Sequence, residues 1–236
     1  MKQTIITADI VASYSMCPRK AYLLLYGKQK DAPHEYVQIL AKHKHDNQTN
    51  YLSKLKQKTL DVHPFEIVGF TNKNHYLTNA ILNINNFETN CGLLTKVTTH
   101  SSLGRYSCEP TIFIGTRKIN KEDKLALYFT AFILEQVQGK APISGSIVDV
   151  AGKLHKTKLV EETRSLLPVL EPLQEWLIED VPEEPPVILN KHCPLCQFRN
   201  SCRTRAKQEN NLSLLARVTP RIIRQYGKTA ILIMGF

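Results

Sequence analysis

The stretch from His75 to Thr116 contains three strand-like segments in succession: "HYLTNAILNINNFE" (75–88), "NCGLLTKVTTH" (90–100) and "YSCEPTIFIGT" (106–116). Each segment is rich in β-branched and other apolar residues, and polar turns separate one from the next. This pattern predicts consecutive β-strands in the middle of the chain.

Helix-like patterns lie on both sides of these strands. Apolar residues recur at helical spacing in residues 7–26 and, more sparsely, in the Lys-rich segment 35–58. Residues 121–138 and 161–178 show the same spacing, and residues 144–160 resemble a hairpin with a glycine at its turn. Helices around a central run of strands predict an α/β (α+β) fold, with a mixed sheet covered by helices.

The composition of the chain restricts its class. Its 236 residues, 42% of them hydrophobic, suffice for one substantial α/β domain with or without a small appendage. No apolar run approaches the roughly 20 residues that a membrane span needs, and the first residues lack a signal-peptide pattern. We therefore expect a soluble, cytoplasmic protein, in which six cysteines serve as ligands or buried thiols rather than as disulfides.

The net charge of +10 is concentrated at the two ends of the chain. Residues 1–60 carry a net +6 and residues 191–236 a net +8, whereas residues 61–190 carry a net −4. Basic segments attract polyanions such as nucleic acids, because neutralised phosphates release counterions. Ordinary solvated surface charge is the alternative.

The segment "NKHCPLCQFRNSC" (190–202) contains three cysteines with the spacing Cys-x2-Cys-x5-Cys. A closed four-ligand site needs one more thiol. Cys17 is the strongest candidate, because its context "YSMCPRKAYL" repeats the Cys-Pro pair found at Cys193. A proline after a ligand cysteine restricts the local backbone and removes a hydrogen-bond donor.

The two remaining cysteines, Cys91 and Cys108, lie in predicted strands, where a lone thiol is usually a small core residue. The predicted four-thiol set is therefore Cys17, Cys193, Cys196 and Cys202. Spacing alone leaves three interpretations open: a zinc site, an iron–sulfur cluster, or unrelated buried thiols.

The segment "ADIVASYSMCPRKAYLLLYG" (8–27) resembles the opening of RecB-like nucleases of the PD-(D/E)XK superfamily that carry a [4Fe–4S] cluster. In the CRISPR-associated and helicase-linked exonucleases of this kind, one N-terminal cysteine joins a C-terminal Cys-x2-Cys-x5-Cys. The resemblance implies a restriction-endonuclease-like core that acts on single-stranded DNA with a helicase partner. It also implies that a [4Fe–4S] cluster, rather than Zn²⁺, joins the N- and C-terminal helical segments. The ligands of this cluster would be Cys17, Cys193, Cys196 and Cys202.

The same resemblance divides the chain into four parts. We expect an N-terminal helical segment (1–62), a nuclease-like core (63–180), a linker with the Cys-rich segment (181–208) and the start of a helix-hairpin-helix-like element (209–236). The last part ends in the short apolar tail "ILIMGF", which is too short for a second helix. We therefore expect a truncated or altered C-terminus.

The resemblance also implies a catalytic site, from which this sequence departs. Such nucleases hold Mg²⁺ or Mn²⁺ with an Asp and a Glu-x-Lys motif on adjacent strands. Gly92 stands where the Asp is expected, Glu109 supplies the second carboxylate, and Thr111 replaces the Lys. Lys118, or alternatively Lys96, would supply the ammonium group. One carboxylate holds Mg²⁺ weakly, because hard cations need several oxygen ligands.

Two main hypotheses about function follow. The chain is either a metal-dependent DNA exonuclease centred on Glu109, or a catalytically inactive, cluster-stapled module that binds nucleic acid beside a helicase. A zinc-stapled scaffold without a role on nucleic acid is a third, weaker hypothesis.

Overall fold

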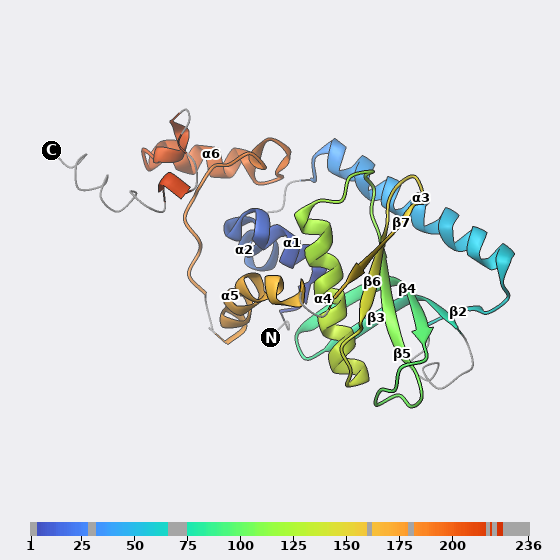
Figure 1. The fold of residues 1–236 in the computed structure, drawn as a ribbon. Helices are drawn as coiled ribbons and strands as arrows, with labels where there is room; N and C mark the ends of the chain where they lie inside the picture. The colour runs from blue at the N-terminus through green and yellow to red at the C-terminus, as the bar shows by residue number, and fades with distance from the viewer. Residues whose placement is uncertain are drawn as a thin grey trace.

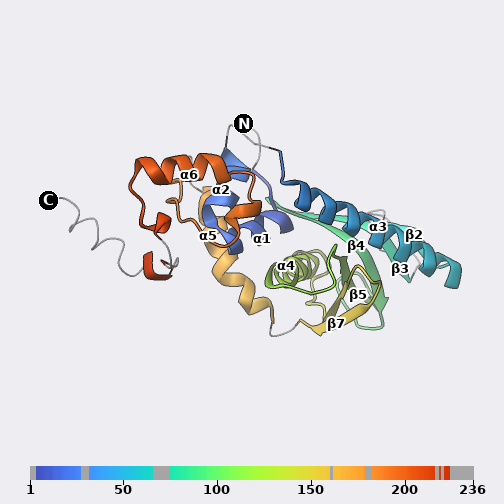
Figure 2. The same ribbon diagram turned by 90° about the horizontal axis from the view of Figure 1, so that it is seen from above.

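The computed structural model describes residues 4–27, 32–65, 75–159, 162–178, 182–215, 218 and 221–223. Within these residues, seven strands form one mixed sheet in the order β2-β3-β4-β5-β6-β7, with β1 beside β4. Helices cover both faces of the sheet, α3 on one side and α4 on the other (Figures 1 and 2). The predicted α/β class is thus confirmed, and the architecture is consistent with a restriction-endonuclease-like α+β fold.

The centre of the sheet is an antiparallel meander of β3 (Tyr76–Ile84), β4 (Phe87–Val97) and β5 (Ser107–Phe113). These are the three strands that the alternating pattern predicts. Asn85, in the tight turn between β3 and β4, has a φ of 50°, a left-handed conformation that asparagine tolerates better than most residues. The short β1 (Ile6–Thr7) pairs in parallel with the start of β4.

One edge of the sheet is the short β2 (Val62–Pro64), which runs parallel to β3. Beyond β5, the helix α4 (Lys121–Gln138) leads to β6 (Ser144–Val148), which is parallel to β5. α4 begins with a capping box between Asn120 and Asp123 and ends at Gly139, whose φ of 63° suits glycine. The edge strand β7 (Leu154–Lys158) completes the predicted hairpin with β6.

The main core lies between the sheet and the helices α1 (Ala8–Met16) and α4. Phe129 and Leu134 of α4 are fully buried there, as is Leu94 of β4. Burial of each side chain of this size stabilises the fold by about 1.5–3 kcal/mol. The helix α5 (Leu167–Ile178) packs on α1 and extends this core.

The opposite face of the sheet carries α3 (Glu35–Lys58) and a smaller core. In that core, Leu52 of α3 packs with Leu93, Phe113 and Val148 of the sheet. The buried side chain of Asn47 donates hydrogen bonds of 3.0 Å to the carbonyls of Ile114 and Val148, so α3 is also held by polar contacts.

The first half of α3 is largely exposed. Val37, expected in an apolar stripe of this helix, is 41% exposed. Gly115 allows the helix backbone to approach β5 closely, since a Cβ at this position would lie 2.1 Å from the carbonyl oxygen of Leu40. α3 therefore approaches the sheet with its backbone at Leu40 and packs apolar side chains such as Leu52 on it in its second half.

The helix expected over residues 7–26 is in fact two helices, α1 and α2 (Pro18–Tyr26). Cys17 interrupts them in an extended conformation, with φ −167° and ψ 112°. The prediction of one continuous helix was wrong because the ring of Pro18 disfavours helical geometry in the residue before it. Despite these dihedral angles, the Cys17 N–H donates to the Ser13 carbonyl at 2.9 Å, and the Cys17 carbonyl accepts from the Ala21 N–H at 3.3 Å.

The C-terminal part returns to the N-terminal helices through an extended segment that ends in a short 3-10 turn, Cys193–Leu195, and α6 (Arg199–Gln208). Arg19, which is 6% exposed, donates to the Pro185 carbonyl at 2.7 Å and to Glu184 at 2.6 Å. Glu184 also accepts from Arg205 of α6 at 2.7 Å. These polar contacts connect the two ends of the fold.

The expected start of a helix-hairpin-helix-like element falls mostly outside the described residues. Along the described parts of the chain, no helix is both long enough and apolar enough to cross a membrane.

Candidate functional site

The four cysteines of the predicted set line one cavity of ≈ 270 Å³. Cys17 comes from the break between α1 and α2, Cys193 and Cys196 from the 3-10 turn and its end, and Cys202 from α6. Apolar side chains complete the wall, among them Leu23, Leu195 and Phe198. We call this arrangement the cysteine clasp, because it joins residues near both ends of the chain.

The thiols of the clasp are close enough to influence one another. The pKa of Cys17 is raised, first by burial and then by the neighbouring thiols Cys193, Cys202 and Cys196, while the backbone N–H of Lys20 has the opposite effect. Thiolates gathered in one half-buried space repel each other, and a bound cationic group relieves that repulsion.

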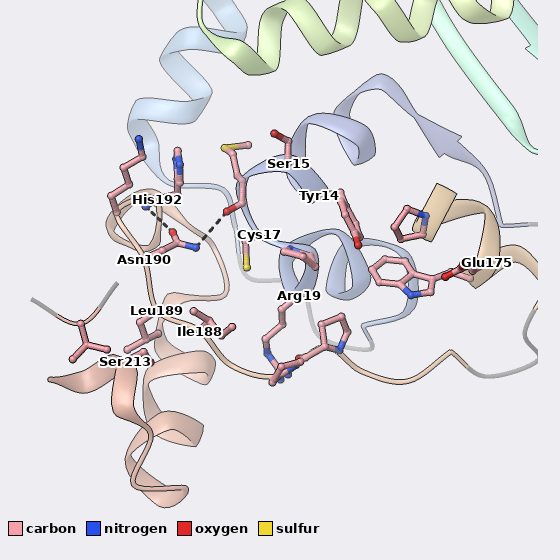
Figure 3. Close-up of a pocket in the computed structure, with 18 residues that line it drawn as sticks. Tyr14, Ser15, Cys17, Arg19, Glu175, Ile188, Leu189, Asn190, His192 and Ser213 are labelled. Atoms are coloured by element: carbon pink, nitrogen blue, oxygen red, sulfur yellow. Dashed lines mark hydrogen bonds between the residues drawn. The ribbon is translucent and has the colours of Figure 1, made fainter. Parts of the chain in front are cut away.

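Asn190 fastens the two halves of the clasp. Its backbone N–H donates to the Sγ of Cys193 at 3.2 Å, and its side-chain amide donates to the carbonyl of Met16 at 3.3 Å. Its Oδ1 accepts from the backbone of His192 at 2.9 Å, as Figure 3 shows. One residue thus orients a candidate ligand and holds the segment before Cys17.

The thiols surround a space rather than meet at a point. Among the described residues, no three His, Cys, Asp or Glu side chains lie together so that they could hold a single metal ion. One zinc ion at about 2.3 Å from each sulfur requires the sulfurs to lie within about 4 Å of each other. An iron–sulfur cluster is larger than a single zinc ion, and each of its cysteine ligands binds a different iron atom.

The second candidate region lies on the sheet face that carries α3. Beyond the contact with the helix, most residues that point to this face are polar, with Val97 and Leu154 as apolar exceptions. The strand register and the alternation of side chains identify this polar face as Thr95, Ser107, Glu109, Thr111, Ser144, Ser146, Lys156 and Lys158. Among these residues Glu109 is the single acid, and its carboxylate lies 3.4 Å from the ammonium group of Lys156.

The residue opposite Glu109 on β4 is Thr95, not Gly92. Gly92 instead lies against the ring of Phe113, where a Cβ would come within 2.5 Å of the ring carbons. The packing of Phe113 therefore requires glycine at position 92. An acid there would meet an aromatic ring rather than share a site with Glu109.

The two lysines expected to assist Glu109 lie elsewhere. Lys118 is exposed in the loop after β5, whereas Glu109 is near the start of that strand. Lys96 points to the other face of the sheet, where its ammonium lies 4.3 Å from the centre of the Tyr106 ring. Burial lowers the pKa of Lys96, and the nearby Cys108 and Asp61 oppose this change.

Lys156 was not foreseen because it lies on β7, far along the chain from Glu109. Its only local signal is the alternation of lysines in "LHKTK", which is typical of a protected edge strand. The pair of Glu109 and Lys156 depends on the register between strands that are distant in sequence. Local spacing does not reveal this register.

A hydrogen-bonded pair of Asp149 and His155 closes the turn between β6 and β7. Asp149, which is 5% exposed, lies 2.8 Å from the Nε2 of His155 and accepts from the backbone N–H groups of Ala151 and Lys153. The pKa of Asp149 is lowered, chiefly by its hydrogen bond with His155. These contacts assign Asp149 a role in shaping the turn.

The other two cysteines, Cys91 and Cys108, are buried in the main core, as expected for lone thiols in strands. Burial raises their pKa values to about 12 and about 11, so both stay protonated at neutral pH.

In comparisons with known proteins, no protein-family model matches the chain, and no curated protein is significantly similar to it. The function is therefore argued from the residues and their geometry.

Proposed function

We propose that this chain is a catalytically inactive, RecB-like module that binds single-stranded DNA in the cytoplasm, beside a helicase, with its ends joined by a [4Fe–4S] cluster. The observation that carries this proposal is the composition of the polar face. Glu109 is its single carboxylate, and the residue opposite on the neighbouring strand is the neutral Thr95.

A face of this composition holds a divalent cation poorly. Mg²⁺ prefers six oxygen ligands and usually binds through one or two carboxylates together with substrate phosphates. Here the one carboxylate already faces the ammonium group of Lys156 at 3.4 Å, and a like charge opposes the approach of a cation. Threonine hydroxyls are neutral, so Thr95 and Thr111 do not replace the missing charges.

We infer that single-stranded DNA binds to the basic terminal segments, which the clasp brings together. On α6, the exposed side chains of Arg199, Arg203 and Lys207 recur every four residues and so share one flank of the helix. Lys191 is exposed just before the 3-10 turn. A row of cations of this kind contacts a phosphate backbone without regard to sequence.

The clasp suits a [4Fe–4S] cluster in three respects. It offers one thiol for each iron, its apolar wall of Leu23 and Phe198 limits access of water, and Asn190 donates an N–H to the sulfur of Cys193. When bound, the cluster would supply iron–thiolate bonds that cross-link the two ends of the chain. The ligands would be Cys17, Cys193, Cys196 and Cys202.

Anaerobic purification followed by metal analysis tests the cluster. The expected result is a brown protein with visible absorption and matching iron and sulfide contents. A colourless protein with stoichiometric Zn²⁺ would contradict the cluster.

Fluorescence anisotropy with a labelled oligothymidylate tests the DNA-binding function. The affinity for DNA should fall steeply as the salt concentration rises. Absence of binding at low salt would contradict the proposal.

A nuclease is the second candidate, because Glu109 supplies a carboxylate, a ligand that Mg²⁺ and Mn²⁺ prefer, on the polar face. With Mn²⁺ and end-labelled single-stranded DNA, the native chain should not cut, whereas Thr95→Asp combined with Thr111→Lys should introduce cleavage. Cleavage by the native protein that Glu109→Gln abolishes would establish the nuclease instead.

A further inference from the structure

A second, larger cavity of ≈ 1040 Å³ adjoins the cysteine clasp. It lies between α1, α5 and the extended segment before the 3-10 turn, and it shares Cys17, Arg19 and residues 188–192 with the wall of the clasp cavity (Figure 3). Neither the clasp nor the polar face explains this space.

One end of the cavity is aromatic and acidic. The rings of Tyr14 and Trp176 meet edge to face, with centroids 5.4 Å apart, and Tyr22 supports the indole from another side at 5.8 Å. Tyr14 and Trp176 line this end of the cavity, and aromatic side chains of this kind bind flat heterocycles by stacking. The carboxylate of Glu175 lies at this end of the cavity and can accept hydrogen bonds from an amino group.

The other end of the cavity is polar and basic. Asn190, Lys191 and His192 line it, and Figure 3 shows Asn190 and His192 on the side opposite Glu175. Lys191 is exposed, so its ammonium group is available to an anion from solvent. The cavity thus has an end that suits an amino-bearing ring and an end that suits a phosphate.

The wall between these ends contains a buried donor without a partner. Arg19 is 6% exposed, and its terminal nitrogens are bound to Pro185 and Glu184. Its Nε has no hydrogen-bond partner among the described residues. This Nε is fully buried, so Arg19 shapes the wall through its contacts with Pro185 and Glu184 rather than by donating into the cavity.

We propose that this cavity binds one nucleotide unit of a DNA strand, with the base against Tyr14 and Trp176, its amino edge toward Glu175, and its phosphate toward Lys191 and His192. The volume is sufficient, because pockets for small organic ligands span about 300–1,000 Å³. The inference rests on the nucleic-acid-binding function proposed above and adds a specific place and orientation for the strand.

Trp176 makes the proposal directly testable, because it is the single tryptophan of the chain. Titration of the purified full chain with dAMP should change its intrinsic fluorescence. Deoxyadenosine lacks the phosphate and dTMP lacks the amino group, so each should bind about tenfold more weakly, as expected for the loss of one charge-assisted contact.

Two variants of α5 provide the matched comparison. Glu175→Gln removes the charge that faces the amino group and should weaken dAMP binding about tenfold while leaving dTMP binding unchanged. Glu171→Gln, an exposed residue one helical turn earlier that does not line the cavity, should leave both affinities unchanged. Both side chains are exposed, and equal thermal unfolding temperatures would confirm that both variants fold.

The possible outcomes distinguish the nucleotide site from the DNA-binding function proposed above. If an oligothymidylate binds by anisotropy while neither dAMP nor the oligonucleotide changes the Trp176 fluorescence, the nucleotide site is wrong and the DNA-binding function stands. If dAMP changes the fluorescence but no oligonucleotide binds, the site stands and the DNA-binding function fails. A fluorescence response to a proline-rich peptide but not to nucleotides would overturn the site in favour of peptide binding.

Discussion

The cysteine clasp and the polar face of the sheet differ in how completely they retain the residues that the RecB-like resemblance implies. The clasp has all four cysteines, and they line one cavity. The polar face has one carboxylate, Glu109, with Thr95 opposite it on β4 and Thr111 two residues later on β5. The four cysteines lie in the α1–α2 break, the 3-10 turn and α6, whereas Glu109 lies on the sheet, so the two regions share no residue.

The largest expected effect comes from breaking the clasp. Cys17→Ser should abolish the iron and sulfide content and lower Tm by about 10 °C or more, because metal ligation contributes directly to folding free energy. Metal analysis and thermal unfolding measure this effect. Cys108→Ala, in the main core, is the control and should retain full iron; equal iron loss in both variants would contradict the four-ligand assignment.

The next effect concerns Gly92 on the sheet. Gly92→Asp should reduce the free energy of unfolding by at least about 3 kcal/mol, because the side chain would collide with Phe113 and bury a charge. Thr95→Asp, three residues later on the polar face, should reduce it far less. Urea unfolding of both variants tests this contrast, and a well-tolerated Gly92→Asp would show that the register argument is wrong.

A smaller loss is expected when the polar connection beside the clasp is removed. Arg19→Ala deletes two hydrogen bonds, one of them to the Glu184 carboxylate, and should reduce the free energy of unfolding by about 2–3 kcal/mol. The same variant should retain the cluster if the thiols hold the ends independently. Loss of iron in Arg19→Ala would show instead that the clasp needs the ion pair of Arg19 and Glu184 in order to bind the cluster.

The smallest effect is a pH dependence at the turn between β6 and β7. Because the folded pKa of Asp149 lies below its unfolded value, its contribution to stability is present above about pH 4 and is lost as the pH falls through the folded pKa. The Tm difference between native protein and Asp149→Asn should therefore be largest near neutral pH and shrink below about pH 4. A difference that grows on acidification would contradict this role.

Much of the fold could be predicted from local patterns. The alternation in residues 75–116 predicts β3, β4 and β5, and the helical spacing of residues 121–138 predicts α4. The Cys-x2-Cys-x5-Cys spacing and the Cys-Pro pair at Cys17 predicted a set of four thiols, and these four line one cavity. The interruption at Cys17 was missed, although the proline after it is a local signal that the helix ends there.

Other features depend on strand register and packing, which local spacing does not encode. Sequence distance suggested Gly92 as the partner of Glu109, whereas the register of β4 and β5 selects Thr95. Likewise Lys118 is nearest in sequence, but the return of β7 beside β6 brings Lys156 to the carboxylate.

The sequence by itself indicated the central strands, the helix α4, the basic ends and the candidate set of four thiols, because periodicity and short motifs are local properties of a chain. Only the tertiary structure decided which residues share the polar face, why position 92 must be glycine, and that a large cavity with an aromatic and a basic end adjoins the clasp. These features arise where segments distant in sequence meet, and their geometry is set by packing rather than by spacing along the chain.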